Sequence, residues 1–130
     1  MRGNPIPTER NIMTKARVSN RDSRGYVKQL KEFKANNLWS EWVHDDNTDT
    51  PDARYVVYSY DRHWPLFIYE VRTDMWFENG SKYSVTTSKH KTQSHPYTAT
   101  TALHVDDMIK VKNNGVTGLI TPLTWREVAL

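Results

Sequence analysis

The chain has 130 residues, enough for one domain with its own hydrophobic core and too few for two ordinary domains. It contains no cysteine, which excludes a disulfide framework, a thiolate zinc site and a cysteine nucleophile. Its formal net charge of +3 is too small to identify a polyanionic partner by itself.

Residues 1–22 are predicted to form a flexible basic arm, because prolines and basic residues are mixed there without an apolar period. Residues 1–14 lack the apolar stretch of about 7–15 residues that a secretory signal needs. No run in the chain approaches the roughly 18 apolar residues of a membrane helix. We therefore expect a protein that acts inside the cell that makes it, without a membrane partner. The folded part is predicted to be one domain over residues 23–130.

A helix is predicted over residues 24–35, with Ser23 as its N-cap. Its apolar face is formed by Tyr26, Val27, Leu30 and Phe33. Trp39 and Trp42 follow, and then an acidic run over residues 44–52 that we interpret as a surface loop. This run lacks the Asp-x-Asp-x-Asp-Gly order and the closing Glu of a calcium loop, so no metal site is predicted.

Two segments rich in β-branched and aromatic residues, 55–60 and 66–71, predict an antiparallel hairpin. The turn between them is Asp61-Arg62-His63-Trp64-Pro65. A third strand is predicted over residues 75–78, where Asn79-Gly80 ends it. We expect this meander to form the core, with Val57, Ile68 and Trp76 buried.

Residues 81–100 are dominated by Ser and Thr and carry Lys and His but no acid. Thr86 or Thr87 is a candidate cap for a short helix that runs through Gln93 and must end before Pro96. A polar loop is the alternative interpretation of this segment.

A further helix is predicted to end before Gly115, from the helical spacing of its apolar residues and two acids in its first turn. These residues are Val105, Met108, Ile109, Asp106 and Asp107. Residues 116–123 are predicted to return as a strand, and Trp125 to pack against the core. This order of elements predicts an α+β fold: a small antiparallel β meander packed with two or three helices.

Two segments, YVVYSYDRHWPL over residues 55–66 and WFENGSKYSVTTSKHKTQSHP over residues 76–96, resemble an uncharacterised family of small tailed-bacteriophage proteins. The helix before Gly115 resembles the C-terminal part of that family less distinctly, so the resemblance covers about residues 55–116. It implies a phage protein that acts in the cytoplasm of a bacterial host. It implies no mechanism.

No catalytic residue and no cofactor are predicted. His63, His90, His95 and His104 are candidate bases, but nothing in the sequence brings them together with an acid. His90 and His95 are five residues apart, which does not place both on one helix face as a zinc pair requires.

The polar segment is the predicted binding site for nucleic acid or another anion, because it is rich in donors and free of acids. The predicted site residues are Lys82, Tyr83, Thr87, Lys89, His90, Lys91, Gln93 and His95. We expect the three lysines to lie on the same exposed side as His90 and Gln93. The flanking tyrosines, Tyr83 and Tyr97, are expected to stack on bases. The alternative is a solvated loop whose hydroxyls cap turns.

The favoured function is therefore that of a non-enzymatic phage accessory protein in the host cytoplasm. It would bind nucleic acid or another polyanion through residues 82–95 and the basic arm. The alternative is a protein-binding modulator of a host factor, because Trp39, Trp42, Trp64 and Arg62 are residue types enriched at interfaces, although the tryptophans also suit a core. A metal-independent nuclease is the third and least favoured candidate.

Overall fold

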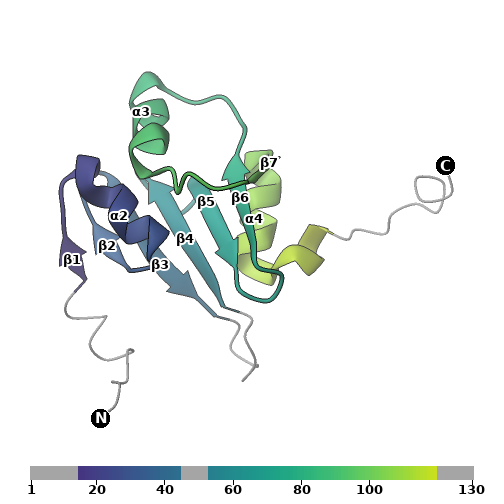
Figure 1. Cartoon of the computed structure of the whole chain (residues 1–130). Helices are drawn as coiled ribbons and strands as arrows, with labels where there is room; N and C mark the ends of the chain where they lie inside the picture. Colours follow the sequence, from purple (N-terminus) through teal and green to yellow (C-terminus); the bar gives the residue numbers. More distant parts are fainter. Residues whose placement is uncertain (1–14, 45–52, 120–130) are drawn as a thin grey trace, which may run out of the picture.

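The computed structural model describes residues 15–44 and 53–119 of the chain (Figure 1). Within these residues the strands form a seven-stranded sheet whose spatial order, β1 to β7, is also their order along the chain. The elements are β1 (Ala16–Arg17), the 3-10 helix η1 (Asn20–Asp22), α2 (Ser23–Lys28), β2 (Phe33–Lys34), β3 (Leu38–Val43), β4 (Arg54–Ser59), β5 (Pro65–Glu70), β6 (Met75–Asn79), α3 (Val85–Ser94), β7 (Thr101–Leu103), α4 (Val105–Asn114) and the 3-10 helix η2 (Val116–Leu119).

The sheet is antiparallel from β2 to β6 and parallel at its two edge pairs, β1 with β2 and β6 with β7. A parallel pair needs a crossover connection, and α3 lies in the crossover between β6 and β7. The predicted α+β class is confirmed, as is the antiparallel order of β4, β5 and β6. The sheet is larger than the predicted small meander, because β2 and β3 and both parallel edges extend it.

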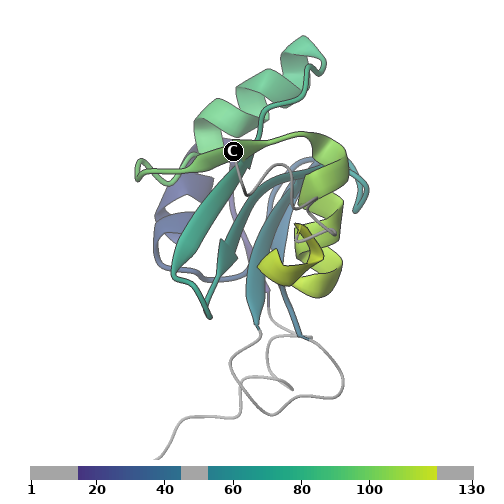
Figure 2. The same cartoon turned by 90° about the vertical axis from the view of Figure 1, so that its right-hand side faces the viewer.

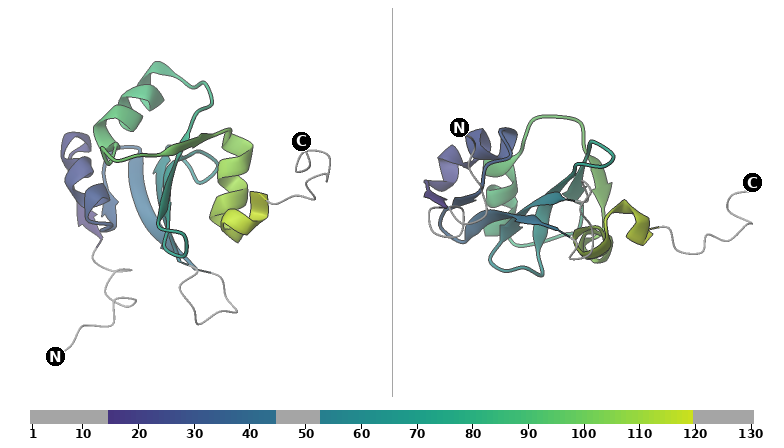
Figure 3. Two further views of the ribbon diagram at one scale, coloured as in Figure 1. Left: turned by 45° about the vertical axis from the view of Figure 1, so that its right-hand side comes forward. Right: turned by 90° about the horizontal axis from the view of Figure 1, so that it is seen from below.

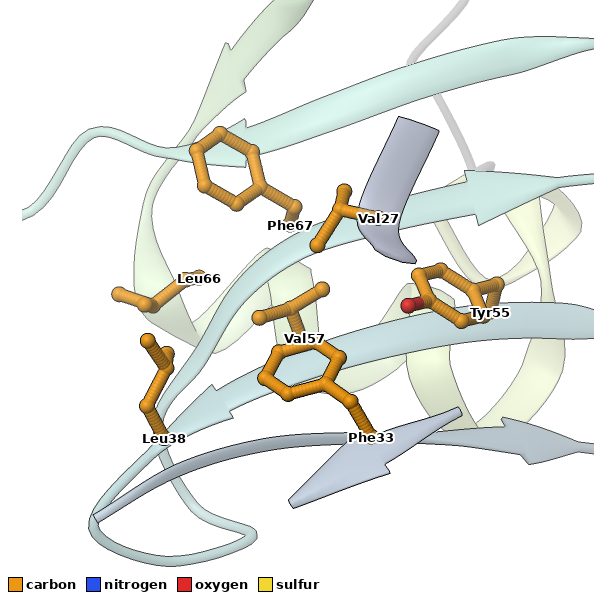
Figure 4. Close-up of a cluster of buried hydrophobic side chains, with 7 residues drawn as sticks. All are labelled: Val27, Phe33, Leu38, Tyr55, Val57, Leu66 and Phe67. Atoms are coloured by element: carbon orange, nitrogen blue, oxygen red, sulfur yellow. The ribbon is translucent and has the colours of Figure 1, made fainter. Parts of the chain in front are cut away.

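Two buried layers lie on opposite faces of the sheet, because successive side chains of a strand alternate between faces. On one face, Val27 of α2 packs over Val57 and Phe67 (Figure 4). On the other face, Met108 of α4 belongs to a cluster with Ile68. Figure 3 shows α2 and α4 on opposite sides of the sheet. Val57 and Ile68 are fully buried, as predicted, whereas Trp76 is only half-buried.

The predicted helix over residues 24–35 is wrong beyond Lys28. Leu30 adopts a left-handed backbone, with φ of 57°, which ends the helical path. Phe33 then enters β2, where its backbone N–H donates to Oγ of Ser40 at 3.1 Å. Pairing with β3 therefore overrides the helical spacing of the apolar residues. The predicted cap is also displaced by one residue, because Asp22 holds the N-cap position and Ser23 is the first helical residue.

Some predictions concern residues that lie partly or wholly outside the described part of the chain. Residues 15–22 of the predicted arm carry β1 and η1, and residues 1–14 lie outside the described part. Residues 116–119 form η2 instead of the predicted strand, and the rest of that strand and Trp125 also lie outside it. Most of the acidic run, residues 45–52, is likewise outside.

The end of α4 is held by two buried charged residues. Gly115 ends the helix with φ of 74° and ψ of −174°. Arg54, which is 1% exposed, donates from Nε to the carbonyl of Lys112 at 2.9 Å. Glu70 accepts the backbone N–H of Val116 at 2.7 Å, just beyond the glycine. A cation at the helix C-terminus also opposes the negative end of the helix dipole.

Across residues 15–44 and 53–119, none of the helices combines the length and the apolar character that crossing a membrane requires. In the same residues, no group of three His, Asp or Glu side chains is arranged to hold a metal ion.

Candidate nucleic-acid interface

Helix α3 begins at a capped turn. The side chain of Ser84 accepts the backbone N–H of Thr87 at 3.1 Å, and the helix ends at Ser94, two residues before Pro96. The predicted short helix is therefore confirmed, with Ser84 as its cap in place of Thr86 or Thr87. The helix extends from the end of the sheet where β4 finishes (Figure 1 and Figure 2).

The buried face of α3 is polar. Thr87 and His90 are 5% and 4% exposed, and Ser94 is fully buried. Oγ of Ser59, the last residue of β4, lies 3.2 Å from Oγ1 of Thr87 and 2.8 Å from Nδ1 of His90. These contacts attach the helix to the sheet, so the structure gives Thr87 and His90 an inward, structural position in place of an exposed one.

Burial lowers the pKa of His90 below its usual value, and the charge of Lys89 adds to this effect. The folded protein therefore holds the His90 proton less tightly than the unfolded chain does. Stability from the neutral imidazole is present above about pH 6.5 and is lost as the pH falls below it. We expect His90→Gln to reduce the loss of thermal stability between about pH 7 and pH 5.

The measurement is the thermal midpoint as a function of pH for the parent, for His90→Gln and for a control variant. His63→Gln is the control, because its side chain is 90% exposed. An acid sensitivity of His90→Gln equal to that of the parent would contradict the assignment.

Lys91 of α3 forms an ion pair with an acid of strand β6. Its Nζ lies 2.8 Å from Oε2 of Glu78 and donates to the carbonyl of Asn79 at 2.9 Å. Partial burial alone would lower the pKa of Lys91, but the bonds to Glu78 and Tyr83 outweigh it and raise that pKa. Glu78 also accepts the hydroxyl of Thr100 and lies 3.7 Å from Nε2 of His95. Lys91 therefore stabilises the crossover and offers little charge to a ligand.

The predicted site residues do not share one exposed side. Lys82 and Lys89 are exposed, Tyr83, Gln93 and His95 are half-buried, and Thr87 and His90 are buried. Lys89 and Lys91 differ by two positions on α3, which is about 200° around a helix. The expectation of a common side is wrong, because only Lys89 faces away from the sheet and Lys91 turns back to Glu78.

Tyr83 and Thr87 also line a hollow of about 340 Å³ beside the start of α3. It is lined by Ser59, Tyr60, Asp61, His63 and Trp64 from the end of β4 and the following turn, and by Tyr83, Ser84 and Thr87. Trp64 and Tyr83 meet edge to face, with ring centroids 6.0 Å apart. The turn residues were not among the predicted anion-binding residues, although Trp64 was named as an interface type and His63 as a candidate base. The exposed aromatic Tyr60 next to the polar Asp61-Arg62-His63 sequence is the signal that could have identified them.

The other two tryptophans that were named as interface types, Trp39 and Trp42, lie in β3. Trp39 stacks on Tyr58 with centroids 4.4 Å apart, and the guanidinium of Arg62 lies 5.3 Å from its ring. Trp42, on the opposite face, donates from Nε1 to the carbonyl of Leu30 at 3.2 Å. Both rings are half-buried and take part in packing.

Comparison of the chain with protein-family models, with curated proteins and with solved structures finds no match.

Proposed function

We propose that the chain is a phage accessory protein of the host cytoplasm that binds nucleic acid through the exposed side of α3 and the segment before it. The two segments that resemble the phage family, 55–66 and 76–96, supply every residue that lines the hollow. Short surface segments of this kind are where binding residues concentrate in folded proteins. The binding role is non-enzymatic, and no step of catalysis is proposed.

The observation that carries the proposal is the chemistry of this surface. Lys82 and Lys89 are exposed, and residues 81–100 contain no acid that would repel a phosphate. The first turn of α3 is also free of acids, and it carries the exposed hydroxyls of Thr86 and Ser88. Cationic and hydroxyl donors beside an aromatic hollow suit a phosphate backbone whose bases lie alongside.

We expect the double variant Lys82→Ala, Lys89→Ala to bind nucleic acid with a shallower salt dependence. If each lysine neutralises one phosphate of a duplex, the slope of log affinity against log salt should fall by about 1.8, or roughly 1.4 for a single strand. The measurement is fluorescence anisotropy of labelled DNA and RNA, single-stranded and duplex, over a series of salt concentrations.

The matched control is Lys28→Ala, Lys34→Ala, which removes the same charge from exposed positions on α2 and β2. It should change the slope much less. A parent protein without salt-dependent binding to any of the four probes would end the nucleic-acid proposal. Equal effects of the two double variants would show that only the overall charge matters.

A protein-binding modulator of a host factor is the second candidate. It is favoured by two exposed apolar side chains near the hollow, Tyr60 at 51% and Val85 at 86% exposure. Docking through such a surface should respond little to salt, which distinguishes it from phosphate binding. A nuclease is not proposed, because Nδ1 of His90 is engaged by Ser59 and His95 faces Glu78.

A further inference from the structure

The hollow beside α3 is large enough to accommodate one planar ring, and aromatic side chains line it. Its volume of about 340 Å³ lies at the small end of the roughly 300–1,000 Å³ range of ligand pockets. Tyr60, Trp64 and Tyr83 give it aromatic walls. Ser59 and Thr87 also line it, but the hydroxyl of Ser59 is already bonded to Thr87 and His90.

The walls are held in place from behind. Trp64 packs against the core cluster on the α2 face and contacts the ring of Tyr83 at its edge. Nζ of Lys91 lies 5.7 Å from the centroid of the Tyr83 ring, and Lys91 is itself fixed by Glu78. A rigid aromatic wall loses little conformational entropy when a ring stacks on it.

The backbone of Tyr60 is anchored, while its side chain is exposed. Its N–H donates to the carbonyl of Asn37 at 2.9 Å, and its φ is 70°. This left-handed backbone is uncommon for a large side chain. The side chain is nevertheless 51% exposed and lines the hollow, so burial in the core does not explain this backbone conformation.

The charges favour a neutral ring in the hollow and a phosphate outside it. Asp61 is the acid among the lining residues, and its Oδ1 is fixed by the backbone N–H of His63 at 2.6 Å. A carboxylate repels a phosphate but accepts N–H groups from the edge of a base. Lys82 and Lys89, outside the hollow, are left for the backbone phosphates.

We propose that this hollow seats one unstacked nucleobase, and hence that the ligand is single-stranded nucleic acid. The inference rests on the proposed function and specifies its ligand. Bases in a duplex are paired and stacked, so none is free to enter a pocket, whereas a single strand can turn a base out onto aromatic side chains.

The test compares Tyr60→Ala with Tyr97→Ala. Both residues are exposed tyrosines with positive φ, of 70° and 54°. Tyr97 was also expected to stack on bases, but it lies beyond the other end of α3 and does not line the hollow. The guanidinium of Arg24 lies 3.9 Å from the centroid of its ring. Stacking of a base on an aromatic ring predicts that Tyr60→Ala weakens single-strand affinity by about 5- to 150-fold. Tyr97→Ala should leave it within about twofold of the parent. The probes are labelled oligonucleotides of about 12 nucleotides, DNA and RNA, single-stranded and duplex.

Tyr60→Phe keeps the ring and should bind like the parent. If Tyr60→Ala fails to fold, Tyr60→Asn removes the ring with a residue that tolerates the left-handed backbone. Equal affinity of the parent for single strands and duplexes, or equal losses in the Tyr60 and Tyr97 variants, would overturn the base seat while leaving nucleic-acid binding intact. Absence of salt-dependent binding to all probes would overturn both proposals.

Discussion

Replacing Ile68 by alanine is expected to lower the free energy of unfolding by about 2–5 kcal/mol. Ile68 lies on β5, is fully buried, and pairs with Val56 on one side and Phe77 on the other. Met108 and Val111 of α4 belong to the same cluster, so removal of the side chain leaves a cavity between the sheet and the helix. The measurement is the denaturant midpoint and slope of equilibrium unfolding.

Val85→Ala is the matched control for Ile68→Ala, because it also truncates a β-branched side chain, but one that is 86% exposed. Its unfolding free energy should stay within about 0.5 kcal/mol of the parent. If Ile68→Ala unfolds at the parental midpoint, the central position of β5 in the core is wrong.

Replacing Gly115 by alanine is expected to cost about 2–5 kcal/mol, from backbone strain of about 1–3 kcal/mol and a weakened hydrogen bond to a charged group. A Cβ at this position would lie 2.7 Å from Oε2 of Glu70, closer than real contacts allow. The same oxygen accepts the N–H of Val116, and Glu70 is only 3% exposed. The carboxylate must therefore move and lose that bond, or the helix end must move.

Gly25→Ala is the control, because Gly25 lies inside α2 and a Cβ there meets no atom within 4 Å. Alanine in a helix is favoured over glycine by about 0.5–1 kcal/mol, so this variant should be slightly more stable than the parent. The two variants are therefore expected to shift the thermal midpoint in opposite directions. A neutral Gly115→Ala would show that Glu70 relaxes freely.

Strands β4, β5 and β6 were predictable because their residues are strongly β-forming and are separated by clear turn signals. Helix α4 was predictable from apolar spacing, acids at its start and a glycine at its end. β3 was missed because a polar residue interrupts its alternation: Ser40 is fully buried between Leu38 and Trp42, and its hydroxyl accepts the N–H of Phe33. The burial of this serine is explained by its hydrogen bond to β2, a partner that the local sequence does not reveal.

Composition was sufficient to identify the candidate binding segment, but it did not reveal which of its side chains are exposed. Composition weighs all side chains of α3 equally, whereas Thr87, His90 and Ser94 recur at helical spacing and turn inward. This polar spacing was the available signal. The pairing of Lys91 with Glu78 joins a helix to a strand earlier in the chain, and no local pattern reveals such a contact.

The strand order places the candidate interface in a crossover connection of the sheet. From β3 to β6, each strand pairs with its neighbours in the chain, so this part of the sheet closes without a crossover. The parallel pairing of β7 with β6 instead requires residues 80–100 to cross over the sheet, and α3 lies within that stretch.

Contacts to β4, β6 and α2 hold this crossover: Ser59 with His90, Glu78 with Lys91, and Arg24 with the carbonyls of Thr92 and His95. If α3 undocks locally, it must break these contacts and the packing of His95 on Phe67, while the pairing of β3 to β6 does not depend on them. The observed affinity would then be the intrinsic affinity multiplied by the docked fraction, so substitutions at these anchors could weaken binding without touching the ligand.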